Sequence, residues 1–292
     1  MSIPFIDYGG SGAQVHFLHA NGYPPACYRP LLRLLTAQYH TICMLLRPLW
    51  KGSNPAEIND WDPFSEDFLR LLDEQKCDRL IAIGHSIGAT VTLRTALKEP
   101  NRFKALVLIE PVIFPLYFIL GWNLVRAFGL GNRLNPKIEG ALKRRREFDD
   151  LDQVFTGYRR RDIFRFFSDE NLRSLISGMT IPKTTNRNNS SSMEGYELAY
   201  SPEWEARIYS TSLWHDWDLW RGISRLEIPT LILRGANTDT FWESTSRSIR
   251  KRNSKVRIVT LEKSTHLLPF EKPLEVFDTT QSFLGELGLE FG

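Results

Sequence analysis

Residues 81–89 constrain the fold of this chain more than any other segment. They read Ile-Ala-Ile-Gly-His-Ser-Ile-Gly-Ala, an apolar run of strand type that passes through Gly84-His-Ser-Ile-Gly88 into a stretch with helical spacing. In a sharp turn from strand to helix the central residue is strained, and the residues two positions away must lack side chains because strand and helix nearly touch. The pattern therefore predicts a buried strand, a tight turn that presents the hydroxyl of Ser86, and a helix over residues 86–98.

A serine hydroxyl needs partners before it reacts at neutral pH. A histidine must accept its proton, and a carboxylate must orient that histidine. His266 follows the strand-type run 256–261, and Asp239 follows the run 229–235. Because the carboxyl ends of parallel strands share one edge of a sheet, we predict that Ser86, Asp239 and His266 meet there as nucleophile, orienting acid and base.

Each of these partners also has a simpler interpretation. Asp239 could instead be the N-cap of a following helix, a position that aspartate often occupies. His266 could be an exposed histidine of a surface loop. Glu110, which ends the run 105–109, lies at the same predicted edge and is the second candidate for the acid. The chain order serine, aspartate, histidine favours Asp239.

The negative charge formed during attack on a carbonyl requires two N–H donors. One would be the backbone N–H of Ile87, directly after the nucleophile, and the other would come from the loop at residues 19–22, where we assign the Asn21 N–H. We expect His19 to hold this loop by hydrogen bonds. His85 is expected to line the floor of the pocket.

Strand-type runs alternate with helical stretches along most of the chain, which predicts an α/β fold, a mostly parallel sheet with helices on both faces. The strand-type runs are residues 14–19, 41–46, 78–83, 105–109, 229–235 and 256–261. Between the runs 105–109 and 229–235 the alternation stops, because residues 113–222 have the pattern of helices and polar loops. We therefore predict a core built from residues 1–112 and 223–292, and a helical cap inserted at residues 113–222.

Four motifs together resemble the α/β-hydrolase fold superfamily. They are the elbow around Ser86, the loop His19-Ala-Asn-Gly22, the acid loop Arg234-Gly-Ala-Asn-Thr-Asp239, and Thr265-His266. Within that superfamily the chain is similar to capped bacterial serine hydrolases of unassigned substrate. The resemblance covers the predicted core.

Two positions depart from the family pattern. Ala20 stands where the oxyanion loop usually has its first glycine, and Thr265 where a glycine often precedes the histidine. Haloalkane dehalogenases and epoxide hydrolases of this fold use a carboxylate nucleophile, so Ser86 disfavours both activities.

The residues and the resemblance imply a serine hydrolase that needs no cofactor. We expect it to form an acyl-enzyme from carboxylic esters, or from thioesters or lactones, with apolar acyl groups. Carbon–carbon bond hydrolysis or a lyase reaction on the same scaffold remains an alternative, as does a small-molecule binding protein without catalysis.

Net charge, charge pattern and cysteine spacing limit the kinds of partner that this chain is expected to bind. The net charge of +3 is small, and the basic runs 143–146 and 159–161 are interspersed with acidic residues, so no nucleic-acid partner is expected. Cys27, Cys43 and Cys77 have no metal-site spacing and suit free thiols in a reducing compartment. We expect no metal, and a homodimer is compatible with the sequence.

The chain start lacks the features of a signal peptide, which favours the cytoplasm. Residues 112–131 are strongly apolar but are interrupted by Pro115, Gly121 and Arg126, so stable membrane insertion is not expected. A helix that lines the pocket or faces lipid fits this segment.

Overall fold

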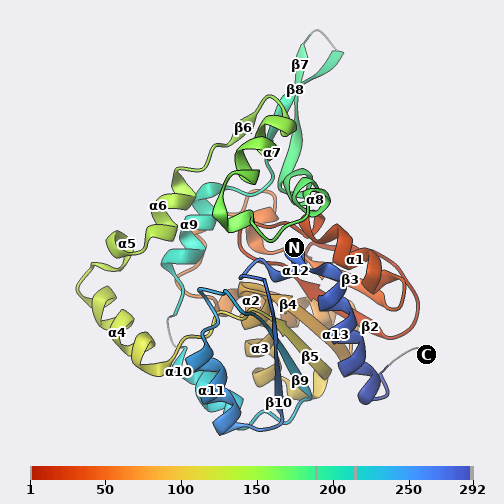
Figure 1. Ribbon diagram of the computed structural model, residues 1–292, viewed down its shortest axis with the longest axis vertical. Helices are drawn as coiled ribbons and strands as arrows, with labels where there is room; N and C mark the ends of the chain where they lie inside the picture. Colours follow the sequence, from red (N-terminus) through yellow and green to blue (C-terminus); the bar gives the residue numbers. More distant parts are fainter. Residues whose placement is uncertain (1, 188–189, 214–215, 290–292) are drawn as a thin grey trace.

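A seven-stranded sheet forms the centre of the protein, and the computed structural model describes residues 2–187, 190–213 and 216–289 (Figure 1). The strands are β1 (Phe5–Asp7), β2 (Gln14–Leu18), β3 (His40–Met44), β4 (Leu80–His85), β5 (Phe103–Ile109), β9 (Thr230–Gly235) and β10 (Val256–Leu261). They lie in the order β1-β3-β2-β4-β5-β9-β10. Strand β1 is antiparallel to β3, and all other neighbours are parallel. The predicted parallel sheet is confirmed.

Helices cover both faces of this sheet. The principal ones are α1 (Arg29–Thr36), α2 (Asp62–Glu74), α3 (Ile87–Lys98), α11 (Glu243–Arg252) and α13 (Pro273–Glu286). Side chains of α2, α3 and α11 belong to a cluster on one face, and side chains of α1 and α13 to a cluster on the other. Strand β5 serves both clusters, because Leu106 and Leu108 point to the first whereas Val107 and Ile109 point to the second.

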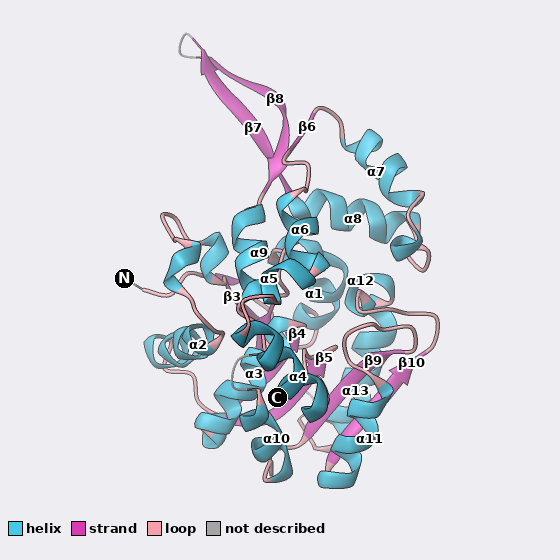
Figure 2. Ribbon diagram, turned by 90° about the vertical axis from the view of Figure 1, so that its left-hand side faces the viewer, coloured by secondary structure: helices cyan, strands magenta, loops and turns pink. Residues whose placement is uncertain are grey.

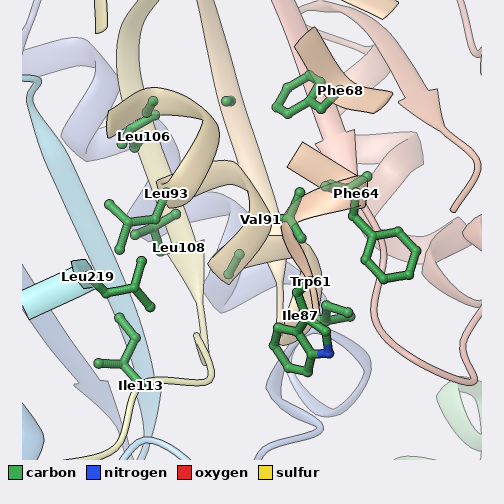
Figure 3. Close-up of a cluster of buried hydrophobic side chains, with 14 of the residues drawn as sticks. Trp61, Phe64, Phe68, Ile87, Val91, Leu93, Leu106, Leu108, Ile113 and Leu219 are labelled. Atoms are coloured by element: carbon green, nitrogen blue, oxygen red, sulfur yellow. The ribbon is translucent and has the colours of Figure 1, made fainter. Parts of the chain in front are cut away.

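The first cluster holds helix α3 against the sheet (Figure 3). Burial of one such side chain stabilises the fold by about 1.5–3 kcal/mol, so the cluster fixes the position at which α3 begins. Its labelled members are Trp61, Phe64, Phe68, Ile87, Val91, Leu93, Leu106, Leu108, Ile113 and Leu219.

A long insertion separates β5 from β9. Its helices are α4 (Leu116–Ala127), α5 (Gly131–Leu134), α6 (Pro136–Leu142), α7 (Leu151–Arg159), α8 (Asp169–Met179), α9 (Pro202–Ser210) and α10 (Trp217–Ser224). A second sheet has the order β6-β8-β7 and consists of β6 (Glu147–Phe148), β7 (Thr180–Arg187) and β8 (Ser190–Leu198). Figure 1 shows β7 and β8 projecting away from the central sheet.

This second sheet corrects the expectation that the insertion contains only helices and polar loops. Strands β7 and β8 read Thr-Ile-Pro-Lys-Thr-Thr-Asn-Arg and Ser-Ser-Ser-Met-Glu-Gly-Tyr-Glu-Leu, with few apolar residues and no regular alternation. Pairing between the two strands, rather than burial of one apolar face, defines the hairpin. Hydrophobic periodicity therefore gave no signal for it.

Candidate active site

The segment from β4 to α3 forms the sharp turn that the sequence predicts. Ser86 lies between strand and helix with φ 57° and ψ −121°, a strained conformation for a residue with a side chain. A Cβ atom at Gly84 would lie 2.5 Å from the Gly88 carbonyl oxygen, and one at Gly88 would lie 2.2 Å from the Leu18 carbonyl oxygen. The glycines therefore allow α3 to approach both its own strand and the end of β2.

Ser86 and His266 are in hydrogen-bonding contact. The distance from Ser86 Oγ to His266 Nε2 is 2.9 Å. His266 lies on the loop between β10 and the short helix α12 (Leu268–Glu271), at the carboxyl edge of the parallel strands, as expected. Ser86 is 7% exposed, so its hydroxyl is sheltered yet open to the cavity that it lines.

The acid beside His266 is Glu110. Its Oε2 lies 3.2 Å from His266 Nδ1, and the Glu110 side chain is fully buried. Its Oε1 accepts a hydrogen bond of 2.6 Å from the Gly235 N–H, and Oε2 also accepts one from the Thr238 hydroxyl. These contacts fix the orientation of the carboxylate toward the imidazole.

The prediction that Asp239 contacts His266 is therefore wrong, because Glu110 occupies that position. Asp239 accepts a hydrogen bond of 2.9 Å from the Thr240 hydroxyl and forms a 3.4 Å ion pair with Lys137 of α6. Desolvation beside the cavity acts to raise the pKa of Asp239, but its interactions with Lys137, His266 and the Thr240 hydroxyl outweigh this and the pKa is lowered. Its side chain is 69% exposed, so the carboxylate that holds His266 is the buried one.

Strand register explains the position of Glu110. His85 and Ile109 are paired across β4 and β5, so Ser86 and Glu110 are the first residues beyond two adjacent strand ends. Glu110 has φ +49°, which turns its side chain away from the direction of the strand. The sequence placed Glu110 at the correct edge, but it gave no information about this turn.

The two predicted oxyanion donors border the same cavity as Ser86. Asn21 and Ile87 both line it. Among the described residues, neither backbone N–H donates to a protein acceptor. The Asn21 side chain is held by one hydrogen bond, which its Nδ2 donates to the Glu205 carbonyl oxygen at 3.0 Å. The backbone N–H groups of Asn21 and Ile87 therefore stay the predicted donors to a substrate oxygen.

A buried hydrogen-bond chain connects the loop of Ala20 to the loop of His266. The Ala20 N–H donates to Tyr28 Oη at 2.9 Å, Tyr28 Oη contacts His85 Nδ1 at 2.7 Å, and His85 Nε2 contacts the His266 carbonyl oxygen at 2.9 Å. Burial holds the pKa of His85 well below its ordinary value, so the ring carries one proton. A carbonyl only accepts, so the proton is on Nε2 and the Tyr28 hydroxyl donates to Nδ1.

This chain also corrects the expectation for His85. The residue is fully buried, and it is not among the described residues that line the cavity. Its ring lies beneath the site, where it supports the backbone of His266 instead of meeting a ligand. Sequence reasoning missed Tyr28 altogether, since nothing in the local pattern marks it.

His19 holds the loop of residues 19–22 by hydrogen bonds, as expected. Its Nε2 accepts the Leu46 N–H at 3.1 Å, so its Nδ1 carries the proton and donates to the Ala20 carbonyl oxygen at 2.9 Å. Burial lowers the pKa of His19 to about 4, which keeps this arrangement intact near neutral pH. Both backbone polar groups of Ala20 are thus fixed by buried side chains.

The cavity over Ser86 has a volume of about 1230 Å³ and is bounded by the core on one side and the insertion on the other. Four rings form one wall of it, which we name the aromatic wall: Phe114, Phe118, Trp122 and Trp242. The ring centroids of Phe114 and Phe118 are 4.9 Å apart, and that of Trp242 lies 5.1 Å from Phe118. The described residues contain no group of three histidine, cysteine or acidic side chains that could hold a metal ion.

Comparison with known proteins adds three findings. A segment of 101 residues is 34% identical to an epoxide hydrolase from Caballeronia sordidicola, over 33% of this chain and only 30% of that protein. The structure resembles E-2-(acetamidomethylene)succinate hydrolase with a TM-score of 0.74 at 17% identity, over 96% of this chain and 94% of that one. It also resembles the thioesterase domain from the curacin biosynthetic pathway, with a TM-score of 0.68 at 15% identity, over 95% and 94% of the two chains.

At these identities the structural likeness concerns the fold. The family comparison reaches further, since the sequence profile described as the alpha/beta hydrolase family matches residues 17–279. With a profile match over most of its length and the corresponding sheet, the chain belongs to the alpha/beta hydrolase family.

Proposed function

We propose that this protein is a serine hydrolase that cleaves carboxylic esters through an acyl-enzyme. The observation that carries the proposal is the 2.9 Å contact between Ser86 Oγ and His266 Nε2, with Glu110 on the opposite ring nitrogen. With Glu110 as a carboxylate, His266 carries its proton on Nδ1, so Nε2 is free to accept the proton of the Ser86 hydroxyl.

The reaction then proceeds in two halves. Ser86 Oγ attacks the ester carbonyl while His266 takes its proton, and the Asn21 and Ile87 N–H groups stabilise the resulting oxyanion. Collapse of this intermediate breaks the bond to the alcohol, which leaves with the proton from His266. Water, deprotonated by His266, attacks the acyl-enzyme, the bond between the acyl carbon and Ser86 Oγ breaks, and His266 returns the proton to Ser86 as the free acid leaves.

The aromatic wall supports an apolar acyl group as the substrate portion held in the cavity. Its rings offer wide apolar surfaces in the same cavity as the polar Ser86 and His266, so an acyl chain or ring packed there would remove apolar area from water. We propose that the insertion, residues 113–222, acts as a cap, since its helices, α4, α6 and α7 among them, supply much of the lining. Thioesters and lactones present the same carbonyl to Ser86 and belong to the same proposal.

The side chain at position 86 argues against the activity named for the epoxide hydrolase relative. Opening an epoxide on this scaffold proceeds through an alkyl ester of a carboxylate, and Ser86 has no carboxylate to form it. A binding protein without catalysis would not require Ser86, His266 and Glu110 to be joined by hydrogen bonds. The joined arrangement favours catalysis.

A covalent probe tests the proposal directly. A fluorophosphonate is expected to label Ser86 stoichiometrically, as located by peptide mass spectrometry, and the same protein should hydrolyse p-nitrophenyl esters. Ser86→Ala should abolish both results, whereas Ser282→Ala, an exposed serine on α13, should change neither. Labelling elsewhere, or turnover that survives in Ser86→Ala, would refute the assignment.

The acyl group is tested with an ester series of increasing chain length. We expect kcat/KM to rise from acetyl to medium-chain or aromatic acyl groups, and Phe118→Ala to reduce this rise more than it reduces acetyl ester turnover. A clear preference for acetyl esters would show that the aromatic wall does not select the substrate.

A further inference from the structure

Helix α4 has an outer face with no charged side chain, and its one polar group is the hydroxyl of Tyr117. Tyr117, Leu120, Leu124 and Phe128 are between 61% and 73% exposed. Their spacing puts them on one side of the helix, and the other exposed positions of that side are Gly121 and Ala127. A surface helix of a globular protein normally carries charged or polar residues on its outer side. This exposed apolar stripe on α4 therefore indicates a binding surface for a partner.

The chain segment that carries this stripe has no acidic side chain of its own. No aspartate or glutamate occurs in residues 111–138, and exposed Arg133 on α5 follows the helix directly. Exposed Leu130, Leu134 and Leu142 extend the apolar surface along α5 and α6. Directly after α6, Lys143 forms an exposed ion pair with Glu139, a contact of the kind that contributes little to stability.

The opposite side of the same helix belongs to the active-site cavity. Phe118 and Trp122 point inward as part of the aromatic wall, whereas Leu120 and Leu124 do not line the cavity. Leu134 does both, because it is 57% exposed and also lines the cavity. Figure 2 looks directly at α4, α5 and α6, which lie at the front of that view.

We propose that this surface docks on an anionic lipid membrane. We name it the α4–α6 face and define it by Tyr117, Leu120, Leu124, Phe128, Leu130, Arg133, Leu134 and Leu142. Its apolar side chains would enter the boundary between headgroups and acyl chains, and Arg133 would lie at the level of the negative headgroups. No described helix is long and apolar enough to cross a bilayer, so the docking is peripheral.

Charge decides between a membrane and a second copy of this chain. A two-fold dimer through the α4–α6 face would bring the Arg133 side chains toward a surface with no acidic residue over 111–138 to balance them. Anionic headgroups supply that balance. An apolar surface that carries the exposed cation of Arg133 matches an anionic lipid interface better than it matches itself.

Vesicle sedimentation with the full chain tests the docking. Wild-type protein should sediment with vesicles of phosphatidylcholine and phosphatidylglycerol in equal amounts, and much less with phosphatidylcholine alone. The double variant Leu120→Ser/Leu124→Ser should lose about tenfold or more in partitioning, and Arg133→Glu should weaken binding most at low salt. Leu274→Ser, an exposed leucine on α13, is the matched control and should bind as wild type does.

Two readouts separate this proposal from the catalytic one. Ser86→Ala protein should bind vesicles as wild type does, because docking does not require turnover. The double variant should retain turnover of a water-soluble ester, because neither leucine lines the cavity. Absence of sedimentation with anionic vesicles would overturn the proposal, and so would equal binding of the double variant. A wild-type dimer that the double variant converts to a monomer would show that a second copy covers the face.

Discussion

Glu110 Oε2 lies 3.2 Å from His266 Nδ1, although the two residues follow strands that are not neighbours in the sheet. Strand β9 lies between β5 and β10, and its end completes the site, because the Gly235 N–H donates to the other oxygen of Glu110 at 2.6 Å. Three strand ends therefore cooperate to hold one imidazole. Asp239, which follows the same β9, points instead toward Lys137 of the insertion.

Exchange of each carboxylate for its amide distinguishes the two acids. Glu110→Gln is expected to lower kcat by about 10³–10⁴-fold, because an amide no longer fixes the His266 tautomer or balances its positive charge. Asp239→Asn should cost less than about tenfold, since it removes an exposed ion pair. Steady-state kinetics on a p-nitrophenyl ester measures both. The larger loss in Asp239→Asn would show that Asp239 replaces Glu110 during turnover.

Removal of one hydroxyl tests the buried chain between the two loops. Tyr28→Phe leaves the Ala20 N–H and His85 Nδ1 without their partner, which should cost about 1–3 kcal/mol of stability. Since Tyr28 is a positioning residue beneath the site, we expect kcat to fall about tenfold or more while KM changes little.

Tyr39→Phe is the matched control for that variant. Tyr39 is also buried, and its hydroxyl donates to Gln281 at 2.9 Å, away from the oxyanion loop. The Tyr39→Phe variant should be somewhat less stable than wild type, but its kcat should be unchanged. If both tyrosine variants lowered kcat equally, the chain from Ala20 to His266 would have no specific role in positioning.

Much of this site follows from the sequence. The glycine spacing predicts the strain at Ser86, and the run that precedes His266 predicts its edge of the sheet. The choice between Glu110 and Asp239 did not follow, because both are carboxylates at the same edge and only the backbone turn at Glu110 aims one inward. The contact between Tyr28 and His85 joins segments through side chains alone, which no local pattern encodes.

The buried histidines predict a pH dependence of stability. Burial lowers the pKa of His16 to about 3 and that of His19 to about 4, and it holds the pKa of His85 well below its ordinary value. Below about pH 6.5 the unfolded chain takes up protons at these positions while the folded chain does not. The free energy of unfolding should therefore fall as the pH drops, by about 1.4 kcal/mol per pH unit for each histidine.

Urea unfolding at a series of pH values between neutral and about pH 5 measures this slope. His16→Gln should reduce the slope of the unfolding free energy against pH by the contribution of one proton, about 1.4 kcal/mol per pH unit. This change in slope is expected whatever the variant does to stability at neutral pH. Glu271 acts in the opposite sense, because burial raises its pKa and the folded chain binds its proton first. A midpoint that does not change across this range would mean that the histidines are protonated in the folded protein.

The same substitution at two glycines should have effects of opposite sign. In Gly88→Ala the new Cβ would lie 2.2 Å from the Leu18 carbonyl oxygen and 2.6 Å from that of His19. These are backbone atoms, so α3 must move away from the oxyanion loop, and we expect a loss of several kcal/mol of stability together with most of the activity. Gly121 in α4 has open space at its Cβ position, so Gly121→Ala should stabilise the protein by about 0.5–1 kcal/mol through helix propensity. Thermal unfolding and ester turnover measure both variants. An active, stable Gly88→Ala protein would show that the close approach of α3 to β2 is not needed to form the site.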